Sequence, residues 1–152
     1  MSPEQKIEEL GLTLPEVVAP LAAYVPTVRT GQLVYTSGQV PMVEGKLHQT
    51  GKLGADLGVD EGREQARICA LNAVAALKAE VGELSRVKRI VKAVVFVASA
   101  PDFTQQPQVA NGASELLAEI FGEAGKHARS AVGVAALPLD APVEVELIAE
   151  VS

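Results

Sequence analysis

The sequence predicts an α+β fold, in which a mixed β-sheet carries two long helices on one of its faces. Hydrophobic residues recur with a period of two in several short segments and with a helical period in two longer ones. These segments follow the order ββ(β)αβαββ, and each β-α-β crossover is expected to be right-handed. The chain has 152 residues, 48% of them hydrophobic, which suits one domain with a sizeable core.

The first elements are predicted to be a short polar helix and a β-hairpin. Residues 2–11 are polar and helix-prone, and Gly11 can end this helix. Residues 25–29 and 33–37 are rich in β-forming side chains and are separated by Thr-Gly-Gln, which predicts two strands and a tight turn. Residues 40–47 contain a proline and a glycine, so they are expected to form a loop or a short edge strand.

Two segments are predicted to be amphipathic helices. Apolar residues recur at intervals of three and four through residues 61–81 and again through residues 107–121. Asp60 is the expected N-cap of the first helix, because its side chain can accept from the free backbone amides of the first turn. Gly82 and Gly122 follow the two periodic segments and are expected to end them.

Three further segments are predicted to be strands: residues 87–98, 128–136 and 143–151. In a strict alternation, Ile90 shares a face with Lys88 and Lys92. In the last strand, hydrophobic side chains on one face alternate with glutamates and one isoleucine on the other. Residues 93–97 are apolar on both faces, which is typical of a strand that is buried on both sides. Because two helices cover only one face of the sheet, we expect a second subunit to cover the other and infer a homo-oligomer.

Composition argues against several classes of function. The formal net charge is −6 and aromatic residues make up 3% of the chain, so neither a phosphate-binding surface nor a stacking platform for bases is expected. Cys69 is the only cysteine, which excludes an internal disulfide framework and fits a reducing compartment. The first ten residues lack the apolar segment of a signal peptide, and no apolar run approaches the ~20 residues of a membrane helix. We therefore expect a cytoplasmic protein that does not bind membranes, and the charge argues against a nucleic-acid partner.

Most strong catalytic and metal-binding motifs are missing from the sequence. No glycine-rich phosphate loop and no nucleophile elbow are present. His48, His127 and Cys69 lack the spacing of metal ligands, so no metal site is expected. Any chemistry must therefore depend on other side chains.

Arg129 is the first candidate for binding a ligand. It begins a predicted strand in which Ala131 and Gly133 lie on the same face, so these small neighbours should leave open space in front of the guanidinium. Arginine can bind a carboxylate through two parallel hydrogen bonds. Glu144 on the following strand could be a proton-transfer group or only a charge partner, so a purely structural Arg–Glu pair remains an alternative.

Several short motifs together resemble those of the Rid proteins. They are Tyr-Val at 24–25, Thr-Ser-Gly-Gln-Val-Pro at 36–41, Arg-Ser at 129–130, Leu-Pro at 137–138 and Val-Glu-Val-Glu at 143–146. The Rid proteins are the RidA/YjgF family of reactive-intermediate deaminases, for which an older name is endoribonuclease L-PSP. The resemblance runs from about residue 24 to residue 151, and the chain looks most like a less-characterised branch labelled endoribonuclease L-PSP/chorismate-mutase-like.

The resemblance implies a fold, an assembly and a domain organisation. It implies a chorismate-mutase-like (YjgF-like) sheet with two helices on one face, assembled as a homotrimer with three clefts between subunits. Residues 24–152 would form the single Rid-like domain, and residues 1–23 would be an N-terminal extension. The family's chemistry implies that neither a metal nor an organic cofactor is required.

The resemblance also implies two catalytic roles. Arg129 matches the arginine that binds the carboxylate of a 2-imino acid. Glu144 matches the acid beside the water that hydrolyses the imine to a 2-keto acid and ammonia. Because the uncatalysed hydrolysis is already fast, modest positioning and acid–base assistance would suffice.

Five further positions match residues that line the substrate cleft in the family. They are Tyr24, Ser37, Gly38, Asn111 and Ala131. Many deaminases have a cysteine at the position of Ala131. The alanine keeps the backbone carbonyl that faces the pocket but lacks the thiol.

Three functions remain open on this basis. The first is a deaminase of 2-imino or enamino acids. The second is a regulatory module that binds a small carboxylate such as a 2-keto acid in the same cleft without turnover. The third is an RNA-cleaving or translation-inhibiting protein, against which the acidic charge and the scarcity of aromatic residues argue. A short approach of Glu144 to Arg129, with a water molecule between them, would favour the first over the second.

Overall fold

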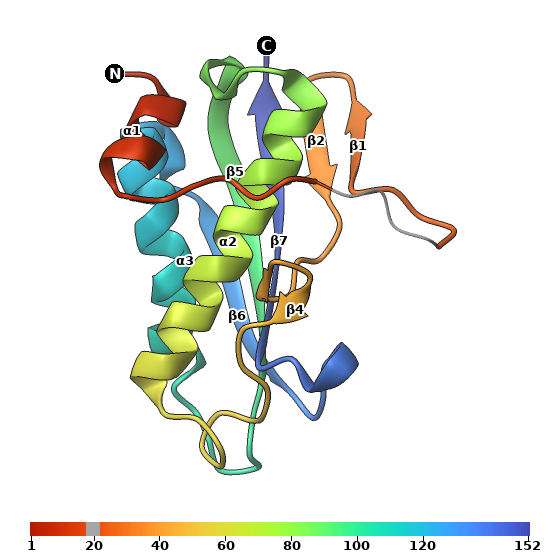
Figure 1. Cartoon of the computed structure of the whole chain (residues 1–152), viewed down its shortest axis with the longest axis vertical. Helices are drawn as coiled ribbons and strands as arrows, with labels where there is room; N and C mark the ends of the chain where they lie inside the picture. The colour runs from red at the N-terminus through yellow and green to blue at the C-terminus, as the bar shows by residue number, and fades with distance from the viewer. Residues whose placement is uncertain (18–21) are drawn as a thin grey trace.

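The computed structural model describes residues 1–17 and 22–152, which form the α+β architecture that the sequence predicts. The main sheet has the strand order β1-β2-β7-β5-β6. Its strands are β1 (Thr27–Thr30), β2 (Leu33–Thr36), β5 (Val87–Ala98), β6 (Ala128–Val134) and β7 (Val143–Val151). Only β5 and β6 are parallel, and the other neighbours are antiparallel (Figure 1). β6 is therefore an edge strand, beside which no further strand of the described chain lies.

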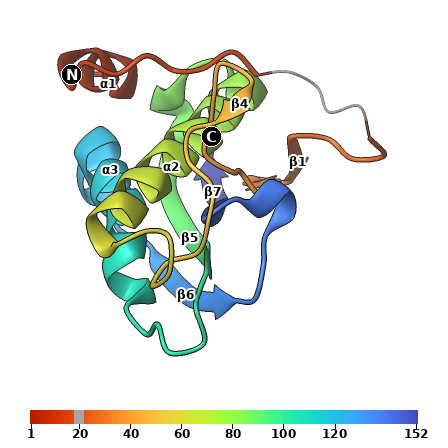
Figure 2. The same cartoon turned by 60° about the horizontal axis from the view of Figure 1, so that its bottom comes forward.

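Two long helices, α2 (Val59–Val81) and α3 (Gln106–Phe121), cover the same face of this sheet (Figures 1 and 2). Hydrophobic side chains that alternate along β5 and β7 point toward the helices and are fully or almost fully buried. The core is almost entirely aliphatic, as the composition predicts. Burial of this continuous apolar surface is the main stabilising contribution to the fold.

Close contact between α2 and α3 sets the position of α3 over the edge of the sheet. A Cβ atom at Gly112 would overlap the carbonyl oxygen of Arg63, so only glycine allows this helix separation. The Arg63 guanidinium also forms an ion pair with Glu115 at 2.7 Å, and Arg67 pairs with Glu119 at 3.2 Å. α3 is thereby held in one orientation relative to β6.

Short strands β3 (Met42–Val43) and β4 (Lys46–Leu47) form a small hairpin where a loop or short edge strand is predicted. Its turn contains Glu44 and Gly45, both with positive φ angles. The Nδ2 atom of Asn72 on α2 donates to the carbonyl oxygens of Val40 and Met42, each at 3.1 Å. This contact holds the segment that follows β2 against the helix.

The N-terminal helix α1 (Pro3–Glu9) packs onto the rest of the fold. Ser2 caps it and Ile7 is buried in the common core. The Glu4 carboxylate accepts from Lys78 Nζ at 2.8 Å and from the backbone N–H of Leu84 at 2.9 Å. Burial raises the pKa of Glu4, but these hydrogen bonds outweigh it and the net pKa is lowered.

Two local predictions are wrong. The N-cap of α2 is Gly58 instead of Asp60, because the Glu61 carboxylate folds back to accept from the Gly58 N–H at 3.0 Å. The strict alternation in β5 also fails: Ile90 is fully buried, whereas Lys88 is exposed. The pairing of β5 with β7 shifts register on each side of Ile90, and such irregularities turn successive side chains to new faces.

The face of the sheet opposite the helices is uncovered in the single chain. It carries several partly exposed apolar side chains, among them Val28, Tyr35 and Val132, which are 55%, 41% and 42% exposed. This surface agrees with the expected need for a second subunit, and the homotrimer itself remains a prediction. Among the described residues, no helix is both long enough and apolar enough to cross a membrane.

Candidate functional site

Arg129 lies on edge strand β6 and points toward the helix-covered side of the sheet. Its partner on β5 is Ala93, which is fully buried under the helices. Arg129 Nη1 donates to Asn111 Oδ1 at 2.8 Å and to Ser114 Oγ at 3.1 Å. Both Nη1 protons are thus engaged, while Nη2 and Nε have no partner within the described part of the chain. Because this unengaged edge carries two parallel N–H groups, it can bind a carboxylate.

Asn111 comes from α3, and its Oδ1 accepts from Arg129. Asn111 and Ser114 are three residues apart, so the helix places both on one face. That face lies against β6 because α3 is packed tightly on α2. Ser114 was not predicted, although its spacing from Asn111 is a signal that the sequence contains.

The space in front of the small residues of β6 differs from the prediction. Ala131 is paired with Val95 and packs against the core. A Cβ atom at Gly133 would lie only 2.7 Å from Gln106 Nε2, so this space is filled. Gln106 is held there by donating to Phe103 O at 2.8 Å and to Ser99 Oγ at 3.2 Å. The expected open space beside Gly133 is therefore wrong, and Gln106 forms a wall that the sequence analysis missed.

Tyr24, Ser37 and Gly38 line one groove of about 680 Å³, between α2 and the segment that follows β2. The Ser37 hydroxyl donates to the Val25 carbonyl at 2.6 Å, so it holds the two segments of the hairpin together. Tyr24 is 59% exposed. The structure thus brings these three predicted residues to one place.

Glu144 lies next to the same segment, on the uncovered face of the sheet. Its carboxylate occupies the place that a side chain at position 38 would need, since a Cβ atom at Gly38 would overlap Glu144 Oε1. Burial, with a smaller contribution from the neighbouring Glu146 carboxylate, raises the pKa of Glu144. A half-buried carboxyl group with a raised pKa is suited to accept and donate protons.

The predicted site residues form two separate groups within one chain. Strand β5 lies between β6 and β7, so Arg129 and Glu144 are two strand spacings, or about 10 Å, apart across the sheet, and they are also offset by three residues, or about 10 Å, along it. Their side chains also point to opposite faces of the sheet. Arg129 pairs with Ala93, which faces the helices, whereas Glu144 pairs with Phe96, which faces away from them. The structural Arg–Glu pair is thus absent within the chain, and a cleft containing both side chains requires two copies.

His127 is a second residue near Arg129 that the sequence analysis did not assign. Its Nε2 lies 2.9 Å from Ser114 Oγ, and its Nδ1 lies 2.6 Å from the carbonyl oxygen of Gly125. His127 and Arg129 are two residues apart in extended backbone, which places them on one face. This spacing is a signal in the sequence, but it is common and carries little information alone.

Other features of the described residues offer no competing active site. No group of three or more His, Cys, Asp or Glu residues there could hold a metal ion. Cys69 is fully buried, and burial, with a smaller effect of Glu144, raises its thiol pKa well above the ordinary value. A buried thiol of this kind is a poor nucleophile.

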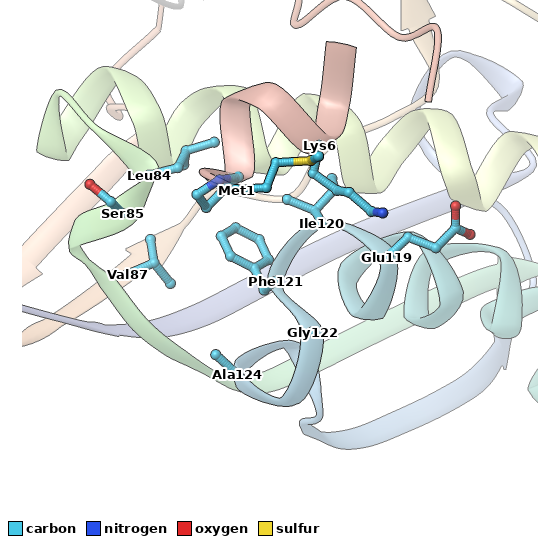
Figure 3. A pocket seen from close by; sticks show the side chains of 11 residues that line it. Met1, Lys6, Leu84, Ser85, Val87, Glu119, Ile120, Phe121, Gly122 and Ala124 are labelled. Atoms are coloured by element: carbon cyan, nitrogen blue, oxygen red, sulfur yellow. The ribbon is translucent and has the colours of Figure 1, made fainter. Parts of the chain in front are cut away.

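A second hollow, of about 500 Å³, lies beside the N-terminus (Figure 3). Met1 approaches it from the residues before α1, Lys6 from α1, Phe121 from the end of α3, and Leu84 from the turn before β5. None of the predicted site residues lines it.

The sequence matches the model of one protein family across almost its whole length. Residues 4–151 match the family described as "YjgF/chorismate_mutase-like, putative endoribonuclease". A curated relative, Protein TCP17 of Trypanosoma cruzi, is 49% identical over 147 residues, which are 96% of this chain and 92% of that protein. The 2-iminobutanoate/2-iminopropanoate deaminase of Escherichia coli K12 is 35% identical over 133 residues, 86% of this chain and 89% of the deaminase.

Solved structures also match this chain over most of its length. Protein Atu1372 of Agrobacterium tumefaciens, whose function is described as unknown, has a TM-score of 0.93 and 47% identity, covering 99% of this chain and 92% of its own. The structure of E. coli TdcF with bound serine has a TM-score of 0.62 and 31% identity, covering 91% of this chain and 93% of its own. On these matches, and on the fold and motifs described above, the chain belongs to the RidA/YjgF (YjgF/chorismate-mutase-like) family.

Proposed function

We propose that this protein is a deaminase that hydrolyses 2-imino or enamino acids to 2-keto acids and ammonia. The observation that supports the proposal most strongly is the hydrogen bonding of the Arg129 guanidinium. Its Nη1 is fixed by Asn111 and Ser114, and its Nη2–Nε edge is unengaged within the described chain. A guanidinium held in this way is pre-arranged to bind a planar carboxylate with two hydrogen bonds.

Glu144 is the proposed acid–base group. Its raised pKa allows it to hold a water molecule as the carboxylate and to carry the proton as the acid. The water oxygen forms a bond to the imine carbon, and the C=N electron pair moves to nitrogen. Glu144 takes one proton from the water and passes it to the nitrogen, which gives a carbinolamine. Glu144 then takes the remaining hydroxyl proton and passes it to the amine nitrogen, so the C–N bond breaks as the C=O bond forms. Ammonia and the 2-keto acid are the products.

The proposed cleft lies between two copies of the chain. Arg129 and Asn111 come from one copy, and Glu144, Ser37 and Gly38 come from the next. The opposite orientation of Arg129 and Glu144 within one chain supports this division. The partly exposed apolar face of the sheet supports an assembly, and we propose a homotrimer with three such clefts.

The names of similar proteins support the substrate class. One relative is a deaminase of 2-iminobutanoate and 2-iminopropanoate, and TdcF has been solved with serine bound. Serine, like a 2-imino acid, carries nitrogen and a carboxylate on the same carbon. We propose the same substrate class for the present chain.

An assay of ammonia release tests the function. An amino-acid oxidase generates 2-imino acids in the assay mixture from a series of amino acids. The rate of ammonia formation is followed with and without the protein. We expect a rate that rises in proportion to protein concentration with at least one 2-imino acid, and that falls to background for Glu144→Gln. Background rates for the wild-type protein with every imine, including aliphatic and hydroxylated ones, would contradict the proposal.

A second function, binding of a small carboxylate without turnover, is favoured by one observation. The Ser37 hydroxyl is committed to the Val25 carbonyl and position 131 is alanine, so few groups besides Glu144 could assist a reaction. Binding of a 2-keto acid that depends on Arg129, together with background rates of ammonia release, would support this function instead.

A further inference from the structure

The Arg129 guanidinium is the end of a chain of hydrogen bonds that continues into the protein. Ser114 Oγ, which accepts from Arg129 Nη1, lies 2.9 Å from His127 Nε2. His127 Nδ1 lies 2.6 Å from the carbonyl oxygen of Gly125. Arg129 is therefore connected through two side chains to a backbone carbonyl.

Hydrogen-bond chemistry sets the direction of this chain. A carbonyl oxygen can only accept, so His127 Nδ1 carries the proton and donates it to Gly125. The Ser114 hydroxyl oxygen accepts from Arg129 Nη1, and its own proton is then available for His127 Nε2. In this arrangement Nδ1 carries the ring proton, Nε2 accepts from Ser114 Oγ, and every donor has an acceptor.

The far end of the chain is rigid. Gly125 is buried in η2 (Gly122–Gly125), the short helix between α3 and β6. A Cβ atom at Gly125 would overlap the carbonyl oxygen of Leu117, so η2 packs directly on the backbone of α3. The Gly125 carbonyl and Ser114 thus belong to one packed unit, and His127 bridges them.

From this geometry we propose that His127 and Ser114 are positioning residues for Arg129. They hold Nη1 in place, so that the Nη2–Nε edge keeps a single orientation toward the substrate carboxylate. Without them, Asn111 alone would hold the guanidinium, and the two donors would no longer be pre-arranged. This inference rests on the proposed function in that it assigns Arg129 as the carboxylate-binding residue.

Three variants separate positioning from general structure. Ser114→Ala removes the bridging hydroxyl, and His127→Phe removes both ring nitrogens while it keeps a flat ring. His127→Gln can place Oε1 near the position of Nε2 and accept from Ser114. His48→Phe is the matched control, because it changes the other histidine, which contacts Gln65 and lies outside this chain of bonds.

Affinity and kinetics are the first readout. Loss of orientation should weaken binding of 2-oxobutyrate and raise KM by roughly three- to tenfold in Ser114→Ala and His127→Phe, with kcat changed less. His127→Gln and His48→Phe should stay within about twofold of wild type. Circular dichroism and thermal melting identify any variant that fails to fold, and either of the two disruptive variants is sufficient for the test.

Nitrogen-15 NMR of arginine is the second readout and needs no ligand. Fixed hydrogen bonds to Nη1 oppose rotation about the Nε–Cζ bond, so the wild-type Nη1 and Nη2 signals of Arg129 should be distinct. They should average in Ser114→Ala and His127→Phe. The His127 ring signals should show a protonated Nδ1 and an unprotonated Nε2.

The outcomes distinguish this inference from the proposed function. If Arg129→Lys loses affinity but Ser114→Ala and His127→Phe keep it, the positioning role is overturned and the proposed function stands. If wild type releases ammonia only at the background rate with every imine and binds no 2-keto acid, the proposed function fails, and NMR alone decides the inference. Averaged Arg129 signals in the wild-type protein, or distinct signals in both disruptive variants, would overturn it.

Discussion

Replacing Arg129 with lysine separates a carboxylate-binding arginine from a cation that only stabilises the edge of the sheet. Lysine keeps the positive charge, but its single ammonium group cannot reproduce the planar set of five N–H donors. In the wild-type protein one nitrogen contacts Asn111 and Ser114 at 2.8 and 3.1 Å, which leaves the other two for a ligand. A lysine that reaches the same two acceptors has at most one proton left for a carboxylate.

The magnitude follows from the number of donors lost. Loss of one charge-assisted hydrogen bond to a carboxylate costs roughly 1.5–3 kcal/mol, which is one to two orders of magnitude in Kd. Gln106 is committed to Phe103 and Ser99, so it offers little compensation. Because Arg129 is partly exposed, the same change should alter the free energy of unfolding by only about 1 kcal/mol.

Isothermal titration with pyruvate or 2-oxobutyrate measures the effect. We expect millimolar or tighter binding by the wild-type protein and no detectable binding by Arg129→Lys. Arg67→Lys is the matched control, since Arg67 pairs with Glu119 away from the site and should keep wild-type affinity. Equal affinities of wild type and Arg129→Lys, or no binding by wild type at millimolar ligand, would refute the reasoning.

Four other predictions concern the assembly, Glu144 and Gly38. Light scattering at micromolar concentration should give three times the chain mass of 15.8 kDa, and a monomer would contradict the expected assembly. Glu144→Gln should abolish catalysis whereas Glu146→Gln should retain it, and equal losses would refute the assignment. Because the pKa of Glu144 is raised, its contribution to stability is complete at acidic pH and is lost as the pH rises through the folded-state pKa. Denaturant unfolding should therefore show Glu144→Gln gaining stability over wild type between pH 4 and pH 8; a constant difference would contradict the raised pKa. Gly38→Ala should displace the Glu144 carboxylate and reduce kcat, while Gly58→Ala at the start of α2, where the nearest atom to a Cβ would be 3.8 Å away, should leave kcat unchanged.

Local features of the fold could be predicted because they depend on neighbouring residues. Gly82 ends α2, and β5 has the bounds predicted for it, residues 87–98. Both features could be predicted because helix ends and hydrophobic periodicity depend on residues that are close together in the sequence. The burial of Ile90 could not be predicted in this way. It depends on the register between β5 and β7, which are separated by more than 40 residues in the sequence.

The candidate site could be predicted only as a set of residues, without its division into two groups. The strand pattern indicated Arg129 and Glu144, and the motif resemblance added Asn111; the structure places Arg129 and Asn111 in contact. That Arg129 and Glu144 point to opposite faces follows from the register of the strands, because Arg129 is paired with Ala93 and Glu144 with Phe96, three residues further along β5. Strand order and register are non-local properties, so no spacing between the two residues could have indicated this orientation. Ser114 and His127 had visible spacings, but these become informative only when α3 is known to lie against β6.

The division of the site leads to a test that no single-chain mechanism can pass. If Arg129 of one copy and Glu144 of the next share a cleft, each interface is heterologous, and in the proposed homotrimer three such interfaces close a ring. Arg129→Lys and Glu144→Gln proteins should each be inactive, because every cleft in either ring lacks one group. When the two are unfolded together and refolded at equal amounts, about one cleft in four receives arginine from one copy and glutamate from its neighbour. Roughly a quarter of the wild-type activity should therefore return. A mixture that stays inactive, although mass spectrometry shows mixed rings, would mean that each cleft draws both residues from one chain, which would contradict the proposed cleft.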